Sequence, residues 1–131
     1  MLGDVKASTL EHRYGVPVLV CAPDGPALRD DGELLDVIGE ASAHQAELVL
    51  LPVERLPAAF FALRSGVAGN LVQKFVNYRL RLAILGDVST QVTHSDALRD
   101  FVCEANRGRQ LWFVATEDEL NQRLAAAASP G

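Results

Sequence analysis

The sequence has few of the residues that build metal and redox sites. It contains two cysteines and three histidines in 131 residues, and they lie far apart along the chain. No Cys-x-x-Cys pair and no spaced set of ligands occurs, so we expect no metal and no other cofactor. Cys21 and Cys103 both fall in apolar surroundings, one in an expected strand and one in an expected helix. We therefore predict two buried free thiols rather than a disulfide.

Long apolar runs and an excess of basic charge are missing as well. The chain has no run of about 18 apolar residues, so we expect no membrane-spanning helix. The start, MLGDVKASTLEHRYG, lacks the charged region and apolar block of a signal peptide, which favours a cytoplasmic protein. A net charge of −5 and an isoelectric point near 5.1 disfavour nucleic acid as a partner.

What remains is the composition of one folded domain. Apolar residues make up 49% of the chain and charged residues 22%, which is the balance of a globular protein. The length is that of a single domain, 1–131. We expect an edge strand within 1–14, paired through a turn at Arg13-Tyr14-Gly15, and a frayed tail at 128–131.

Short apolar runs alternate with segments that have apolar residues at helical spacing. The runs predict strands at 16–22, 46–53, 79–87 and 110–115, and the spacing predicts helices within 30–45, 67–78, 95–108 and 116–128. The order β(β)αβαβαβα predicts an α/β fold with about four helices and a mostly parallel or mixed sheet of four to five strands. The run AELVLLPV is apolar on both faces, which is typical of a central strand.

Binding sites in such sheets tend to lie at the carboxyl ends of the strands. Three segments follow strand ends here, 52–69, 86–95 and 115–116, and the first is the longest. It contains FFALRSGVAGNLVQKF, in which Arg-Ser-Gly leads into a helical pattern. The candidate ligand- or partner-binding residues in or next to these segments are Glu54, Arg55, Arg64, Ser65, Gly66, Asn70 and Asp87.

Ser65 has three readings. The simplest is a helix N-cap, with Gly66 after it relieving crowding. The free N–H groups of a helix start beside Arg64 would also suit an anion, and the same site would accommodate a phosphate on Ser65. As a nucleophile Ser65 lacks the GxSxG context, and only His94 lies near a strand end to serve as its base. The spacings of the common phosphate-binding loops are absent too.

Two other features stay open. Glu54 and Arg55 follow a strand directly, either as a weak surface ion pair or as the rim of a pocket. Asp87 follows the next strand and could bind a metal or a ligand hydroxyl, or cap the following loop. An enzyme would use Ser65, or Glu54 together with Asp87.

Two stretches carry a family resemblance: LPVERLPAAFFALRSGVAGNLVQKFVNYRLRLAILGD and SDALRDFVCEANRGRQLWFV. They resemble a bacterial family of small proteins that is catalogued as a domain of unknown function, over roughly Val16 to Leu124. The element order is also distantly similar to the STAS domain of anti-anti-sigma factors and sulfate transporters. That similarity implies a helix that begins with a serine phosphorylated by a partner kinase. Ser65 falls at this position, and Arg64 stands where such domains carry an acidic residue.

We therefore predict a non-catalytic regulatory or protein-interaction module that phosphorylation of Ser65 switches. A small anionic-ligand-binding protein that uses 65–70, and an uncharacterised enzyme, are the alternatives. The predicted partner is a protein or a small anionic ligand. A homodimer through the N-terminal edge strand or a helix face is also open.

Overall fold

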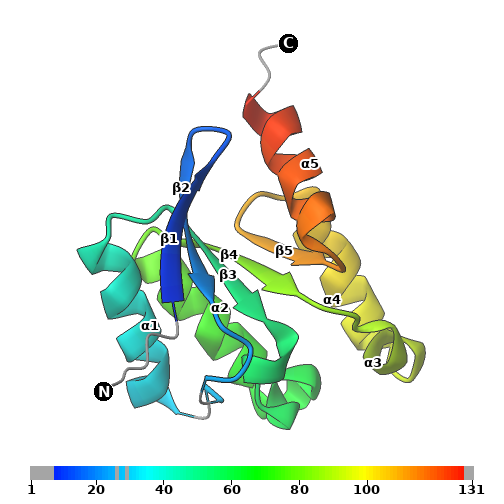
Figure 1. Ribbon diagram of the computed structural model, residues 1–131. Coiled ribbons are helices and arrows are strands. Elements are labelled where there is room, and N and C mark those ends of the chain that lie inside the picture. The colour runs from blue at the N-terminus through cyan, green and yellow to red at the C-terminus, as the bar shows by residue number, and fades with distance from the viewer. Residues whose placement is uncertain (1–7, 26, 29, 129–131) are drawn as a thin grey trace.

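The computed structural model describes residues 8–25, 27–28 and 30–128, and Figure 1 shows their arrangement. The strands are β1 (Ser8–Arg13), β2 (Val16–Cys21), β3 (Leu48–Pro52), β4 (Arg81–Leu85) and β5 (Leu111–Val114). The α-helices are α1 (Asp31–Ala43), α2 (Val67–Asn77), α3 (Ser89–Thr93), α4 (Asp96–Arg107) and α5 (Glu117–Ala128). Three 3-10 helices, η1 (Val53–Arg55), η2 (Ala58–Phe61) and η3 (Leu63–Ser65), connect β3 to α2. The predicted α/β order is confirmed.

The five strands form one mixed sheet in the order β1-β2-β3-β4-β5. β1 is antiparallel to β2, and the other three pairs are parallel. Tyr14 and Gly15, with φ of 53° and 81°, form the tight turn between β1 and β2, where positive φ values match the twist of a hairpin. The predicted edge strand and its turn are therefore confirmed from residue 8 onward. The rest of the expected edge segment, 1–7, and the tail residues 129–131 lie outside the described residues.

The sheet order decides where the helices go. Each parallel strand lies beside the strand that precedes it in the chain, so every crossover advances in the same direction. Crossovers of one hand that advance in one direction place their helices on one face. The helices α1, α2 and α4 accordingly pack on one face of the sheet, over a core that includes Ile38, Phe75 and Phe113. Among the described elements, α5 alone covers the other face (Figure 1), through Leu120 and Leu124.

The cover that α5 provides is incomplete. Val18, Leu50 and Ala83 are fully buried on this second face. Val20 and Leu85, which lie closer to the carboxyl ends of β2 and β4, are only partly buried. The second face is therefore open where the parallel strands end.

Two features of the fold differ from the sequence expectation. The described residues form five α-helices rather than about four, because α3 occupies the segment expected to be a loop after β4. The long connection from β3 to α2 is a series of 3-10 turns, two of which are preceded by Pro52 and Pro57. Elements of three to five residues are too short to show a periodic apolar pattern, so the sequence could not indicate them.

The prediction that both thiols are buried is wrong for Cys103. Cys21 is 3% exposed and faces the core, whereas Cys103 lies on the exposed side of α4. The apolar stripe of α4 faces the sheet through Phe101, Val102 and Ala105, and Cys103 falls outside it. Burial raises the pKa of the Cys21 thiol and so disfavours its reactive thiolate.

The two cysteines should react at very different rates. We expect one thiol per chain to react rapidly with Ellman's reagent under native conditions, and the second only when the protein unfolds. The substitution Cys103→Ser should abolish the rapid phase and leave the slow one. Two rapid thiols, or none, would contradict the described packing of β2 and α4.

Candidate functional site

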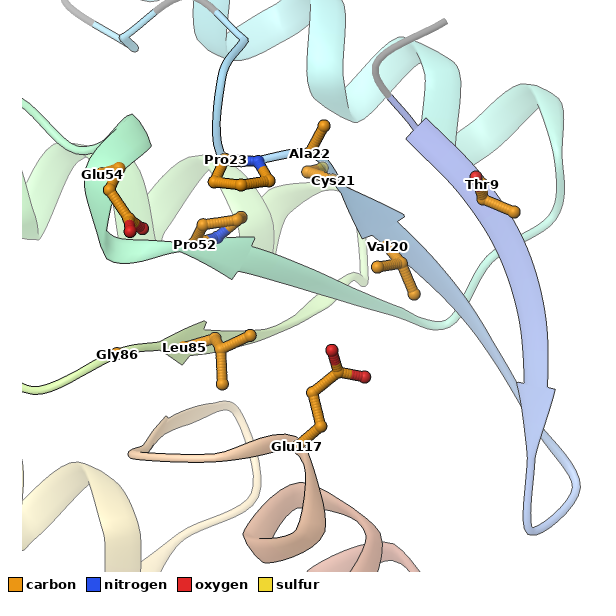
Figure 2. Close-up of a pocket in the computed structure, with 10 residues that line it drawn as sticks. All are labelled: Thr9, Val20, Cys21, Ala22, Pro23, Pro52, Glu54, Leu85, Gly86 and Glu117. Atoms are coloured by element: carbon orange, nitrogen blue, oxygen red, sulfur yellow. The ribbon is translucent and has the colours of Figure 1, made fainter.

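A hollow of about 400 Å³ lies where the parallel strands end, and we call it the strand-end groove. Figure 2 shows the residues that line it, which come from β1, β2 and the segment after it, β3, η1, the end of β4 and the start of α5. They are Thr9, Val20, Cys21, Ala22, Pro23, Pro52, Glu54, Leu85, Gly86 and Glu117. Its position agrees with the general tendency of α/β sheets to bind ligands at the carboxyl ends of strands.

The floor of the groove is apolar. Val20 on β2 is paired with Thr9 on β1. Pro52 on β3 is paired with Leu85 on β4. Val20 and Leu85 also pack against the core under α5. The floor thus continues the second face of the sheet beyond the part that α5 covers.

Two carboxylates project toward the groove from opposite sides (Figure 2). Glu117, the first residue of α5, accepts a hydrogen bond of 2.7 Å from Nη2 of Arg13, which also binds Glu11. Burial alone would lower the pKa of Arg13, but its bonds to these two glutamates outweigh burial and raise it. The Glu54 side chain is exposed, and its carboxylate makes no hydrogen bond or ion pair within the described part of the chain. Glu54 therefore presents an uncompensated negative charge.

Arg55 was expected either on the surface or at the rim of a pocket, and it lies in neither place. It is 4% exposed, so it is neither half of a surface ion pair nor a rim residue. Its Nη1 donates a hydrogen bond of 3.0 Å to the Ala22 carbonyl, and its own carbonyl accepts one of 2.8 Å from Leu28 N–H. A Cβ at Gly25 would lie 2.6 Å from Cζ of Arg55, so the chain passes directly over the guanidinium. Arg55 supports the wall of the groove from beneath.

Ser65, Gly66 and Asn70 lie elsewhere, in a second hollow of about 280 Å³ that we call the helix-start hollow. Ser65 Oγ donates to the Ala59 carbonyl at 2.7 Å and accepts from Val67 N–H at 3.1 Å. The prediction that Ser65 is the N-cap of α2 is wrong, because Gly66 holds that position and no side chain makes a capping bond there. Ser65 lies one residue earlier, and its hydroxyl bonds to the first N–H of the helix. Gly66 does not relieve crowding, because the space around it is open; its φ of 80° is what favours glycine.

The electrostatics of the helix-start hollow do not favour an anion. Asp30 and Asp31, from the start of α1, line it together with Ser65. Asn70 Nδ2 donates a hydrogen bond of 2.9 Å to Asp31, and Lys74 lies 3.7 Å from the other oxygen of that carboxylate. Arg64 is exposed, is not among the lining residues, and has no ion pair within the described residues. The sequence could not reveal this, because the contact between α1 and α2 is tertiary.

Asp87 caps the chain after β4. Its Oδ1 accepts a hydrogen bond of 2.9 Å from Ser89 N–H, and this bond lowers the pKa of the carboxyl. Asp87 lines a third hollow, between α3, α4 and β5, whereas Glu54 lines the strand-end groove. His94 follows the last residue of α3, and its ring Nδ1 is hydrogen-bonded to the Thr90 carbonyl of that helix. Asp87 and His94 are therefore each hydrogen-bonded to a backbone group a few residues away in the chain.

The match to a family model covers most of the chain. The model described as "Domain of unknown function (DUF4180)" matches residues 13–124. This chain belongs to the DUF4180 family. The DUF4180 match includes the helix-start hollow and every residue of the strand-end groove except Thr9. No curated protein and no solved structure matches the chain.

Two kinds of structure are absent from the described residues. No group of three or more His, Cys, Asp or Glu that could hold a metal ion occurs among them. None of the helices in the described ranges is long and apolar enough to cross a membrane.

Gly86 fixes the position of η1 over the end of β4. Its φ is 145°, and a Cβ there would lie 2.4 Å from Cγ1 and 2.9 Å from Cβ of Val53. We expect Gly86→Ala to lower the free energy of unfolding by about 2–4 kcal/mol, because both strain and overlap must be relieved. Gly39→Ala is the matched control, since that glycine lies in α1 with open space around it. The control should raise stability by up to about 1 kcal/mol. Equal effects in urea unfolding would contradict the described contact.

Proposed function

We propose that this protein is a non-catalytic regulatory module that binds a protein partner through the segment 54–70 and the start of α2. Phosphorylation of Ser65 would switch that surface. The observation that carries the proposal is the pair of hydrogen bonds made by the exposed Ser65 hydroxyl. One goes to η2 through the Ala59 carbonyl and the other comes from α2 through Val67 N–H. This single side chain therefore joins the connecting segment to the helix.

A phosphate on Ser65 would change both the contacts and the charge of this surface. The modified oxygen can no longer donate to the Ala59 carbonyl, so the tie to η2 is lost. Nearly two negative charges would also enter a hollow that Asp30 and Asp31 already line. The helix start and the exposed Arg64 would favour the new charge, while the two aspartates would oppose it. The segment would then rearrange rather than keep its unmodified conformation.

The topology supports the proposal by analogy. A sheet in which β1 is antiparallel and β2 to β5 run parallel in chain order has the element order expected of a STAS-like domain. Ser65 occupies the end of the connection from β3 to the next helix, where such domains carry their switch residue. Function does not follow from fold, so this similarity only adds weight to the local geometry. A bacterial, cytoplasmic protein fits the same proposal.

The alternative of a small anionic ligand at 65–70 has less support. The hollow there has two aspartates in its lining and lacks Arg64. An anion bound at the start of α2 would therefore meet repulsion from the start of α1. The interaction module is the stronger reading for this surface.

The first test concerns the structural role of Ser65. The substitution Ser65→Ala removes both hydrogen bonds and should lower the free energy of unfolding by about 1 kcal/mol. Ser65→Thr keeps the hydroxyl and should recover most of that loss. Ser42→Ala, at an exposed position in α1, is the matched control and should change stability little. The measurement is urea unfolding followed by Trp112 fluorescence and far-ultraviolet circular dichroism. A neutral Ser65→Ala would contradict the proposed tie.

The second part of the test asks whether the switch acts on a partner. Tagged wild-type, Ser65→Asp and Ser42→Asp proteins are used for affinity capture from the source cells, and residue 65 is analysed by mass spectrometry. We expect a protein captured by the wild type and the Ser42 variant but released by Ser65→Asp. An unmodified Ser65 under all growth conditions, with identical capture by all three proteins, would sink the switch.

A further inference from the structure

The strand-end groove has no part in the Ser65 switch, and its chemistry differs from that of the helix-start hollow. We propose that it binds a small organic cation, an amine or guanidinium attached to an apolar body. Glu54 belongs both to this groove and to the proposed partner-binding segment 54–70. The inference does not rest on the Ser65 switch, because neither Ser65 nor the start of α2 lines the groove.

Size and floor argue for an apolar body. A volume of about 400 Å³ lies within the range of small-molecule sites, roughly 300–1,000 Å³. Val20, Pro52 and Leu85 form a continuous apolar floor from three neighbouring strands. This floor is open because α5 covers only the part of the face nearer the middle of the sheet. An apolar group placed there would bury surface that the chain itself leaves partly exposed.

The charge of the walls argues for a cation. The described lining residues include Glu54 and Glu117 and no lysine or arginine. Arg13 compensates Glu117 from outside the groove, through their 2.7 Å ion pair. Glu54 has no such partner among the described residues and projects toward the groove in Figure 2. A cation above the apolar floor would therefore meet an available carboxylate in a protein whose net charge is −5.

Three of the lining residues offer no backbone N–H to an anion. Pro23 and Pro52 have no N–H to donate. The Gly86 N–H is already donated to the Val114 carbonyl at 2.9 Å. These three positions therefore give an anion no backbone donor to offset the negative charge of the two glutamates.

The test uses 2-phenylethylamine as the cation, with 2-phenylethanol and phenylacetate as neutral and anionic analogues of the same body. Binding is followed by amide chemical shifts of the isotope-labelled full chain. We expect the amine to shift Val20, Leu85 and Gly86 and to bind at least about tenfold more tightly than the alcohol. Phenylacetate should cause no saturable shift of these residues.

Two variants separate the carboxylate from general electrostatics. Glu54→Gln should weaken the amine about tenfold and leave the alcohol unchanged. Glu104→Gln makes the same change in net charge at an exposed position on α4 and should leave both ligands unchanged. Both variants should keep the wild-type unfolding midpoint, because both side chains are exposed.

Several outcomes would overturn the inference. The first two are equal affinities for the amine and the alcohol, and saturable shifts confined to residues outside the groove. The other two are a higher affinity for phenylacetate than for the amine, and an unchanged affinity for the amine in Glu54→Gln. A capped lysine peptide that binds more tightly than the free amine would assign the groove to a partner side chain, which also overturns it. Loss of amine binding in Glu54→Gln with an intact Ser65 switch would support the groove and leave the proposed function untouched.

Discussion

Strands that follow one another in the chain are neighbours in this sheet, and most of the structure depends on that constraint. Because the crossovers share one hand, α1, α2 and α4 must gather on the same face. The opposite face is equally apolar, since its strands are buried on both sides. Only α5, the last described helix, lies over it. The chain therefore buries one face thoroughly and leaves part of the other available for binding.

The attachment of α5 sets the limits of the open face. Leu120 and Leu124 are buried against the sheet, and a fully buried leucine contributes roughly 1.5–3 kcal/mol. At the start of the helix, Arg13 joins β1 to Glu117 and also reaches Asn121 at 3.4 Å. These contacts hold α5 in place on the second face, while Val20 and Leu85, near the ends of β2 and β4, stay partly exposed. The groove is thus a consequence of topology, and its charge comes from the two glutamates at its walls.

Local sequence patterns predicted much of the fold, because the physics that forms strands and caps is local. The apolar runs located the parallel strands, and the serine expected at the start of α2 does bond to the first N–H of that helix, although Gly66 is the N-cap. The pattern also directed attention to the carboxyl ends of the strands, where the groove lies. The conformational role of Gly66 was missed, since a positive φ leaves no periodic signal.

The composition of the sites could not be predicted, because it depends on contacts between distant segments. Arg55 follows a strand like any surface residue, yet the loop at Ala22 closes over it. Asp31 is separated from Asn70 by 39 positions, and their hydrogen bond joins the start of α1, with its two aspartates, to α2 across the helix-start hollow. In the sequence, Glu117 is an ordinary acidic residue in the first turn of a helix. Only the structure shows its ion pair with Arg13 of β1. In each case the sequence shows the residue but not its neighbour.

The most direct test of one-sided coverage is the accessibility of methyl groups to a neutral paramagnetic cosolute, measured by relaxation enhancement. The structure predicts strong enhancement for the methyl groups of Val20 and Leu85 at the strand ends. It predicts little for Val18 and Leu50, which are 0% exposed beneath α5 on the same face. Equal protection of all four residues would contradict the open groove. Equal enhancement would show that α5 does not cover the sheet.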